Sequence, residues 1–530
     1  MLKDTDQKIL IRTDDAAVIE NYIVDESSIF HGSADSVVYP RDEYEVSEIF
    51  KEANDKKIKI TISGAGTGVT GSRVPLGGWV LSTELLTNIE SRPSDNGKII
   101  RFKGLKNEGT IFLGYDKDGP YAISPPGISL ALFKKLVEQE GFYYPPDPTE
   151  SSASLGGTLA TNASGARTYH YGSTRDYVRR IRVVIPEGNV LNIKRGEVFA
   201  KDNKFEIMKE GQIKYEIKLP GYVMPDVKKN AAGYFNKPGM DLIDLFIGSE
   251  GTLGLITEIE LKLLSKPSDI YTFFAVYNSE SEAIELVKKL KTEKDEQILA
   301  IEFFDANSIS VIRETYPAKI PAGSKSIIYF ELNAFNDKNL YHILELVKDC
   351  DYLFSNKGFS INTILLSEEE AKDIRHSLPE SINFKLRSLN LPKVATDIAV
   401  PEGKLDEMLE AYHAVGTTTN VNYALFGHIG DNHLHFNFIP ANQQELNSAI
   451  AGCVLLWKKG ISLGGTVTAE HGVGKKFYIE GNEKKPLLEL MYGRDELMEI
   501  ARIKHVLDPT HILNVGNIVP EDILDISCHS

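Results

Sequence analysis

The sequence contains little cysteine and little basic charge, and it has no long hydrophobic run. Its 530 residues include three cysteines, Cys350, Cys453 and Cys528, none of which belongs to a CxxC motif. This excludes a disulfide framework and a thiolate zinc site, and it indicates a reducing cytosolic setting. No apolar stretch approaches the ~18 residues that a transmembrane helix needs. The first residues lack the apolar core of a signal peptide, so we expect no secretory leader.

Acidic residues outnumber basic residues by 75 to 59, which gives a formal net charge of −16. Such a chain lacks the basic face that a duplex-DNA binder or an anionic-membrane coat needs, so nucleic acid is not an expected partner. Apolar residues make up 42% and charged residues 25% of the chain, which is typical of soluble globular proteins. At about 150 residues per domain, the length predicts roughly two to four domains.

Periodic apolar residues predict regular elements in both halves of the chain. Helical spacing predicts helices over Asp42–Asn54 and Leu130–Glu140, and alternating isoleucines predict a strand over Ile58–Ile62. Beyond Lys266-Pro267, strand-like and helical segments alternate, which predicts an α+β second domain. The predicted strands are Tyr271–Tyr277, Ile298–Asp305 and Ser326–Leu332, and the predicted helices are Ser281–Leu290, Leu340–Val347 and the tail segment Asp495–Leu507.

The glycine-rich range Ser63–Gly71 follows the first predicted strand and contains a formal GxGxxG match. The dinucleotide fingerprint requires a helix directly afterwards, whereas Pro75 and two glycines follow here, so we reject a nicotinamide site. Taken alone, the loop is either an anion-binding nest of backbone N–H groups or a plain turn. Two similar stretches, Ser154–Gly165 and Gly248–Gly254, favour the first interpretation, because three such loops predict a long ligand held along its length.

Three histidines lie close together in the range Phe426–Asn437. His433 and His435 alternate with apolar residues, which predicts a strand with its polar side chains on one face. A Gly-Asp-Asn turn can return His428 to the side of His435. Neutral imidazoles at two such points suit zinc or another borderline divalent metal, but histidines that are only hydrogen-bonded fit the pattern as well.

The segment Thr466–Gly474 supplies a candidate third ligand in Glu470, with His471 directly after it. Because neighbouring side chains point in different directions, one of the pair can bind a metal while the other faces a substrate. The same Glu-His-Gly sequence also fits a helix cap or a turn.

The motifs of the first half resemble the flavin domain of the vanillyl-alcohol-oxidase/PCMH superfamily in their order and spacing. They are Val37–Pro40, Ser63–Gly71, Tyr144–Pro148, Gly156–Gly165, Arg175–Tyr177 and Leu245–Gly254. The resemblance implies a two-lobed α+β domain that binds FAD, and the absence of histidine from the first loop implies that the FAD is non-covalent. The expected cofactor-binding residues are Ser63, Gly64, Ala65, Gly66, Thr67, Gly68, Thr70, Pro146, Gly156, Gly157, Thr161, Asn162, Gly165, Glu250, Gly251, Gly254, Ile256 and Asn514.

The histidine segment, the Glu-His segment and the tail Ile503–Asn514 resemble the C-terminal FAD-linked oxidase domain of D-lactate and D-2-hydroxyglutarate dehydrogenases. This resemblance implies a divalent metal, usually zinc, and a substrate site beside it. The implied metal ligands are His428, His435 and Glu470, the implied base is His471, and the implied substrate-binding residues are Asn437 and Arg375, with Lys393 as a further candidate.

The sequence departs from this family in two places. The metal loop usually reads GDGNLH, but here Asn432 and His433 replace the glycine and the asparagine, so His433 either disturbs the turn or offers an alternative ligand. The tail usually reads LNPGK, but here it is Leu513–Asn517.

The fold that these resemblances imply is α+β, with a PCMH-type FAD-binding domain and a cap domain that has a mainly antiparallel sheet. We expect the FAD-binding domain over residues 1–267 and the substrate and metal cap domain over residues 268–485. Residues 486–530 are expected to form a C-terminal helical segment that returns to the FAD-binding domain.

The predicted enzyme is an FAD-linked dehydrogenase that oxidises a D-lactate-like 2-hydroxy acid to the 2-oxo acid, with the metal positioning the substrate, His471 as base and flavin N5 as hydride acceptor. Ala395 stands where relatives that favour a dicarboxylate carry lysine, which favours a monocarboxylate. The alternatives are a D-2-hydroxyglutarate or glycolate dehydrogenase, alone or as a subunit of a larger complex, and a net non-redox synthase of the alkyl-dihydroxyacetone-phosphate type.

The family precedent for the electron acceptor is a quinone, a cytochrome or an electron-transfer flavoprotein, and neither NAD nor oxygen is expected. We expect a protein in the cytoplasm, either free or peripherally attached to the inner membrane. Whether it is a monomer or a homodimer stays open.

Overall fold

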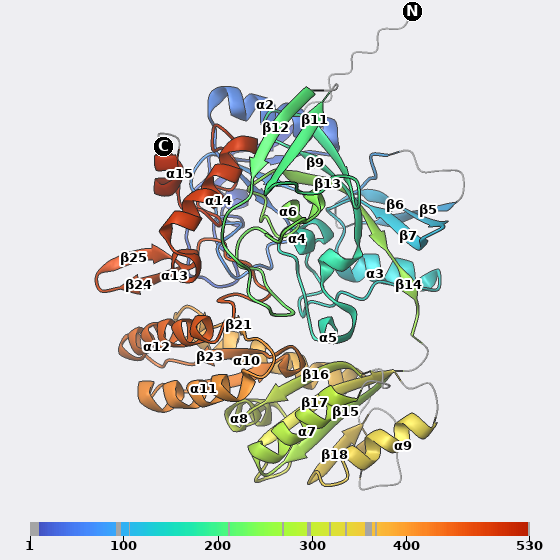
Figure 1. The fold of residues 1–530 in the computed structure, drawn as a ribbon, viewed down its shortest axis with the longest axis vertical. Coiled ribbons are helices and arrows are strands. Elements are labelled where there is room, and N and C mark those ends of the chain that lie inside the picture. Colours follow the sequence, from blue (N-terminus) through green and yellow to red (C-terminus); the bar gives the residue numbers. More distant parts are fainter. Residues whose placement is uncertain are drawn as a thin grey trace, which may run out of the picture.

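The computed structural model describes residues 10–91, 97–104, 106–209, 212–267, 270–293, 298–316, 320–333, 337–355, 363–365 and 368–527. These residues form two lobes stacked along the long axis of the molecule (Figure 1). The N-terminal lobe comprises residues 10–267 together with the C-terminal residues 487–527. The cap lobe comprises residues 270–462, and residues 463–486 connect it back to the N-terminal lobe.

A four-stranded sheet of order β1-β2-β4-β3 carries the first glycine loop. Its strands are β1 (Ile11–Thr13), β2 (Ser36–Tyr39), β3 (Ile60–Ser63) and β4 (Trp79–Ser82). Helix α2 (Glu43–Lys56) confirms the first predicted helix: it begins after Asp42, whose carboxylate accepts the N–H of Glu45 at 2.9 Å. It buries Val46, Ile49, Phe50 and Ala53. The glycine loop therefore leaves the end of β3, a strand held from one side by this packed helix.

A six-stranded antiparallel sheet of order β10-β9-β13-β7-β6-β5 forms the second half of the N-terminal lobe. The strands are β5 (Gly97–Lys103), β6 (Glu108–Asp116), β7 (Gly119–Ser124), β9 (Val178–Val184), β10 (Val190–Lys194) and β13 (Leu255–Lys262). The predicted second helix is confirmed as α3 (Leu130–Gln139). The other two small-residue stretches lie on this half: α4 (Leu155–Ala160) runs through one, and the other leads directly into β13.

Short elements complete the N-terminal lobe. They are α1 (Ala16–Ile19), β8 (Phe142–Tyr143), α5 (Thr168–Tyr171), η1 (Thr174–Tyr177), the hairpin β11 (Lys204–Lys209) and β12 (Gln212–Lys218), α6 (Leu242–Phe246) and β14 (Leu264–Ser265).

The cap lobe is built on a nine-stranded sheet of order β19-β18-β15-β17-β16-β22-β23-β20, with β21 paired to β23. All the strand pairs that the structure describes in it are antiparallel except β18 with β19, which confirms the expected mainly antiparallel sheet. The strands are β15 (Ile270–Tyr277), β16 (Ile298–Phe304), β17 (Ser326–Asn333), β18 (Tyr352–Ser355), β19 (Thr363–Leu365), β20 (Val394–Ala395), β21 (Ile398–Ala399), β22 (Tyr423–Gly427) and β23 (His433–Phe438).

Helices cover this sheet, and each predicted strand and helix of the region is present within a few residues of its expected bounds. The helices are α7 (Glu280–Thr292), α8 (Ala306–Thr315), α9 (Asp337–Leu346), α10 (Glu368–Ser388), α11 (Leu405–Thr419), the short η2 (Ile429–Asp431) and α12 (Gln443–Ser462). A hairpin of β24 (Phe477–Glu480) and β25 (Glu483–Pro486) follows on the connecting segment.

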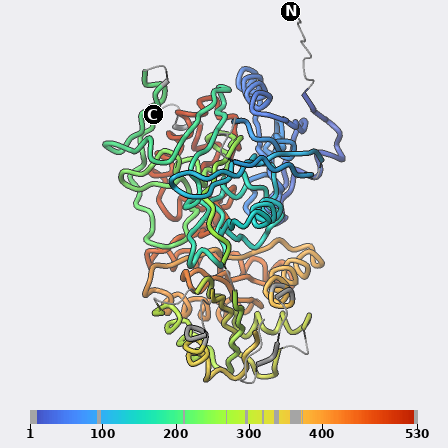
Figure 2. Tube along the Cα trace, turned by 90° about the vertical axis from the view of Figure 1, so that its right-hand side faces the viewer, coloured from blue at the N-terminus to red at the C-terminus, as the bar shows by residue number. Residues whose placement is uncertain are grey.

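The C-terminal helices α13 (Leu487–Tyr492), α14 (Arg494–Leu507) and α15 (Glu521–Ser527) pack on the N-terminal lobe, as the red segments beside the blue and green ones in Figure 2 show. Leu513 forms a parallel bridge with Ile60 of β3. Asn514 accepts the N–H of Ile62 at 2.7 Å and donates to the carbonyl of Glu250 at 2.7 Å. The end of the chain thereby joins the first glycine loop to the third.

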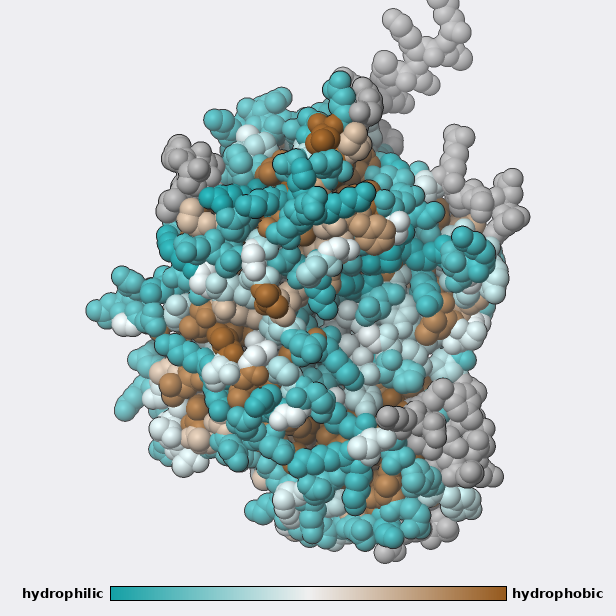
Figure 3. All heavy atoms as spheres, in the orientation of Figure 1, coloured by the Kyte–Doolittle hydropathy of each residue, from teal (hydrophilic) through white to brown (hydrophobic). Residues whose placement is uncertain are grey.

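The surface in Figure 3 is mainly hydrophilic, with apolar side chains in scattered patches. None of the helices in the described part of the chain combines the length and the hydropathy needed to cross a membrane.

The buried ammonium of Lys504 holds the C-terminal segment in place. It donates to the carboxylate of Asp508 at 2.7 Å and to the carbonyls of Leu513 and Thr252 at 2.7 and 3.0 Å. We expect Lys504→Met to lower the free energy of unfolding by about 3 kcal/mol, because it leaves a buried carboxylate without its cation. Arg502→Met on the same helix removes only an exposed ion pair, so its cost should stay below about 1 kcal/mol. Thermal unfolding of both variants checks this, and equal losses would contradict the role of Lys504.

Candidate active site

A long cleft with a volume of about 330 Å³ runs along the three small-residue stretches of the N-terminal lobe. Most of the predicted cofactor residues line it: Gly64, Ala65, Gly66, Thr67, Gly68, Gly156, Gly157, Thr161, Glu250, Gly251, Gly254, Ile256 and Asn514. The other predicted residues, Ser63, Thr70, Pro146, Asn162 and Gly165, are not among its lining. Two of these serve packing: a Cβ on Gly165 would lie 2.0 Å from the carbonyl oxygen of Asp147, and Asn162 accepts the N–H of Arg175.

The first loop has the properties of an anion cradle. Among the described residues, none accepts a hydrogen bond from the backbone N–H groups of residues 64–68. Gly66 has a φ of +84°, which a side chain would strain, and a Cβ on Gly68 would meet no atom within 4 Å. Residues 64–68 line the cleft, and backbone N–H groups without an internal acceptor are the donors that a pyrophosphate needs, so the residues present fit the phosphate portion of FAD.

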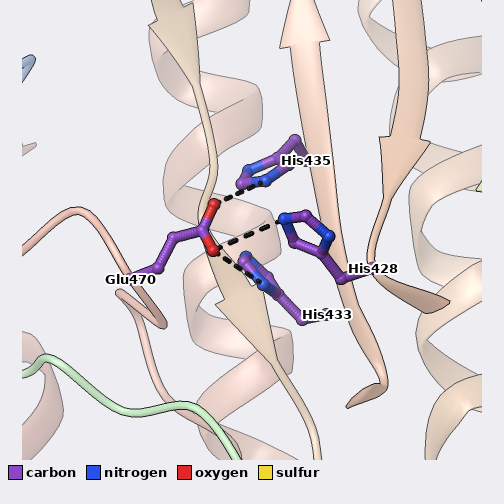
Figure 4. Close-up of side chains that lie close together, drawn as sticks. All are labelled: His428, His433, His435 and Glu470. Carbon is purple, nitrogen blue, oxygen red and sulfur yellow. Dashed lines mark ion pairs between the residues drawn. The ribbon is translucent and has the colours of Figure 1, made fainter. Parts of the chain in front are cut away.

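The predicted metal ligands converge in the cap lobe, where Glu470 points at three histidine rings (Figure 4). Its Oε1 atom lies 3.2 Å from Nε2 of His435, and its Oε2 atom lies 3.4 Å from Nε2 of His428 and 3.9 Å from Nδ1 of His433. One donor atom from each of these four residues lies within 4.8 Å of all the others. The arrangement follows from the sheet, because β23 places His433 and His435 on one face and the turn after β22 returns His428 to them.

Two buried carboxylates hold the outer sides of these rings. Glu302 on β16 lies 2.9 Å from Nδ1 of His428, and Asp397 lies 2.7 Å from Nε2 of His433. Asp397 also accepts the backbone N–H of His471 at 2.9 Å, and its Oδ2 atom lies 3.1 Å from the Nδ1 atom of that ring. Carboxylates behind imidazoles fix the ring orientation and tautomer, which is the usual arrangement around a metal.

The electrostatics of the cluster keep its acids ionised. Burial alone would raise the pKa of Glu470, but the ammonium of Lys229 at 3.1 Å and the nearby imidazoles hold that pKa well below its usual value. Asp397 likewise has a strongly lowered pKa, because His471 and His433 outweigh its burial. Burial together with His435 lowers the pKa of His433 to about 3, so this ring is neutral. His428 differs, because Glu470 and Glu302 outweigh burial and Lys229 and raise its pKa to about 9. Neutral imidazoles and an ionised carboxylate are the states that bind metals, so a metal would have to displace the proton of His428.

A second cavity of about 170 Å³ opens between the cluster and the flavin-type cleft. The predicted substrate residues Arg375, Asn437 and Lys393 line it, as does His471. It shares Thr149, Lys393, Glu470 and His471 with the long cleft. The predicted base therefore stands where the two spaces meet.

Arg375 is not a free guanidinium in this cavity. Its Nε and Nη2 atoms donate to Glu302 at 2.7 and 2.8 Å. This is the forked pairing that the sequence analysis predicted for a substrate carboxylate. Among the described residues, none accepts a hydrogen bond from its Nη1 atom. Glu302 therefore holds two of the three guanidinium nitrogens and leaves Nη1 for another partner.

Sequence reasoning missed Glu302, Lys229 and the part that Asp397 plays. Each is a single residue far along the chain from the motif it supports, and each lies on an unremarkable strand or loop. The one signal for Glu302 was its position as a lone glutamate in the otherwise apolar, fully buried strand Ile298–Phe304.

Family models match most of the chain. The model described as "FAD binding domain" matches residues 34–194, and the one described as "FAD linked oxidases, C-terminal domain" matches residues 266–518. The chain belongs to the FAD-linked oxidase family. Its N-terminal lobe therefore contains an FAD-binding domain of the PCMH type, as the sequence motifs predicted.

Individual relatives are similar over nearly the whole length. The chain is 27% identical to the glycolate oxidase subunit GlcD of Bacillus subtilis (strain 168) over 504 residues, with 94% of this chain and 92% of that protein covered. It is 27% identical to a D-lactate dehydrogenase of Anaerostipes hadrus over 512 residues, with the same two coverages. A solved structure of alkyldihydroxyacetonephosphate synthase has the same fold, with a TM-score of 0.62, 15% identity, and coverage of 96% of this chain and 82% of that one.

Glu250 joins the two lobes at the site. Its carboxylate accepts the N–H groups of Val473 and Gly474 at 2.7 and 2.8 Å and the hydroxyl of Ser72 at 2.5 Å. The first contacts hold the segment that carries Glu470 and His471, and the last one holds the end of the first glycine loop. Glu250 therefore positions the cap residues over the cleft that it also lines.

Glu250→Gln tests this connection. The amide nitrogen of glutamine would face a backbone N–H, so at least one hydrogen bond to a charged acceptor is lost, which costs about 1.5–3 kcal/mol. We expect the purified variant to lose bound FAD on gel filtration and to turn over at least about tenfold more slowly. Glu258→Gln is the matched control, because Glu258 is equally buried in the same lobe but lies outside the cleft. Full flavin content and rate in Glu250→Gln would contradict the proposed connection.

Proposed function

We propose that this protein is an FAD-dependent dehydrogenase that oxidises a small D-2-hydroxy acid to the corresponding 2-oxo acid. The observation that carries the proposal is the shared wall of the two cavities: His471 and Glu470 face both the cleft of the FAD-binding domain and the small cavity with Arg375 and Asn437. The preference for the D configuration rests on the similarity to a D-lactate dehydrogenase.

The small cavity suits an anion with a short apolar side chain. Its volume of about 170 Å³ is below the range of about 300–1,000 Å³ for drug-sized ligands. Arg375 and Lys393 supply the positive charge that a carboxylate needs in a protein of net charge −16. The stacked rings of Phe304 and Phe426 and the side chain of Ala395 supply apolar walls, which supports a monocarboxylate such as D-lactate.

When bound, FAD supplies a hydride acceptor and a divalent ion supplies a charge that makes the substrate hydroxyl more acidic. The residues around the cavity supply the proton transfer and the geometry. Asp397 accepts the N–H at Nδ1 of His471, which leaves the lone pair of Nε2 to take a proton from the hydroxyl. Asn437 follows His435 on the same face of β23, so its amide reaches the substrate from the side of the metal ligands.

Anaerobic mixing with D- and L-2-hydroxy acids tests the function directly. We expect D-lactate and other short D-acids to bleach the visible flavin absorbance, and we expect L-acids to leave it unchanged. A chelator should abolish the bleaching. His471→Ala should slow it by about a hundredfold or more, because the hydroxyl proton then has no acceptor.

His413→Ala is the control for that variant, since His413 pairs with Glu280 on the outside of the cap lobe. It should bleach at the wild-type rate. Bleaching by D-acids at an unchanged rate in His471→Ala would remove His471 from the reaction, and no bleaching by any 2-hydroxy acid would remove the proposed function.

The charge of Lys393 predicts a pH dependence. Burial, together with Lys476, lowers the pKa of Lys393 to about 8, so the ammonium is present below that pH and is lost above it. The kcat/KM for the D-acid should therefore fall as the pH rises through about 8. Lys393→Met should lower kcat/KM about tenfold at pH 7 and remove the decrease of kcat/KM above about pH 8. Lys385→Met, on the surface, should preserve that decrease. An identical pH profile in Lys393→Met would show that this lysine does not bind the anion.

A further inference from the structure

His433 lies directly behind the expected metal ligands His428, His435 and Glu470, but it has no role of its own in that set. Its ring lies beside those of His428 and His435, with centroids 5.3 and 4.5 Å away. The side chain is completely buried, and its Nδ1 atom has no hydrogen-bond partner. A buried imidazole nitrogen without a partner carries an uncompensated desolvation cost, unless a bound ligand or ion occupies the space in front of it.

The hydrogen bond on the other side of the ring decides what this nitrogen can do. Nε2 of His433 lies 2.7 Å from Oδ1 of Asp397, and an ionised carboxylate can only accept a hydrogen bond. Nε2 therefore carries the hydrogen, and Nδ1 presents a bare lone pair. That lone pair lies 3.9 Å from the Oε2 atom of Glu470, on the same side as the Nε2 atoms of His428 and His435.

The size of the cluster fits one ion. Ligands on opposite sides of a metal are about 4.2 Å apart at bond lengths of about 2.1 Å. The four donor atoms already lie within 4.8 Å of one another, so an ion needs only small side-chain movements to reach all of them. His428, His435 and Glu470 line the substrate cavity, whereas His433 does not. A bond from His433 would thus approach the ion from behind and leave its cavity side open for a substrate.

We propose that His433 is a fourth protein ligand of the divalent metal, which makes the site three imidazoles and one carboxylate. The inference rests on the metal site of the proposed function and deepens it. With four protein ligands and a hydroxy acid held through two oxygens, the ion becomes six-coordinate. Such a site is better suited to Mn²⁺, Fe²⁺, Co²⁺ or Ni²⁺ than a tetrahedral zinc site is.

Counting nitrogens on a bound ion tests the assignment without any turnover. The chelator-treated protein is loaded with one equivalent of Cu²⁺, and the nitrogen couplings in its EPR spectrum are counted. We expect three directly bound imidazoles in the wild type and two in His433→Asn. His413→Asn should keep three, because its ring lies outside the cluster. In parallel, the Kd for Zn²⁺ should rise at least about tenfold in His433→Asn, as loss of a ligand predicts.

His471 is an alternative source of the third coupled nitrogen, because its ring stacks on that of His435 with the centroids 5.2 Å apart. His471→Asn should keep three nitrogens. Two nitrogens in the wild type, or three in His433→Asn, overturn the proposal. Flavin absorbance and thermal unfolding show whether His433→Asn folds. If it does not, His471→Asn decides the question. Three coupled nitrogens in that variant come from His428, His433 and His435 and support the proposal, whereas two coupled nitrogens overturn it.

These outcomes are separate from those of the proposed function. A wild-type protein that binds no divalent ion contradicts the metal in both proposals. If three imidazoles bind the ion but no 2-hydroxy acid reduces the protein, His433 is still a ligand and only the proposed reaction is contradicted.

Discussion

A buried carboxylate is costly unless cations and hydrogen-bond donors replace the water that it loses. Three carboxylates with little exposure lie where the two lobes meet: Glu302 and Asp397 of the cap lobe and Glu470 of the connecting segment. Arg375 forks onto Glu302, Lys229 reaches Glu470, and backbone N–H groups and imidazoles surround Asp397. The position of each of the site residues described above depends on this balance of buried charge.

The same balance explains why Lys229 lies against Glu470. Lys229 is contributed by the N-terminal lobe and is almost completely buried, yet its ammonium is aimed at a residue of the connecting segment. Its charge compensates part of the negative charge of Glu470, at the same Oε2 atom that faces His428 and His433. The N-terminal lobe thus holds the connecting segment at the site itself, through Lys229 on Glu470 and Glu250 on the backbone just beyond His471. The positions of Glu470 and His471 therefore depend on the packing of the N-terminal lobe.

Periodicity was enough to predict the elements that carry the site. The alternation around His433 and His435 predicted a strand with both rings on one face, and β23 has this arrangement. The small-residue stretches predicted a backbone that a ligand approaches closely, and most of their residues line the cleft. Gly165 shows the limit of that reasoning, because a glycine required by the carbonyl of Asp147 looks the same in sequence as one required by a ligand.

The supporting residues could not be predicted because their partners depend on tertiary packing. Arg375 was expected to face a substrate, but nothing in its own helix indicates that Glu302, 73 residues earlier, takes two of its nitrogens. That pairing changes the chemistry of the cavity: Glu302 also holds the outer nitrogen of His428, so Arg375 and His428 are oriented by the same carboxylate. An anion that binds the remaining nitrogen of Arg375 therefore meets a guanidinium already fixed in place, on the same support that holds the ring facing the cluster. In the proposed reaction, one carboxylate would thus orient both the guanidinium that binds the substrate and a ring that binds the metal, which is the condition for a precise approach of the reacting groups.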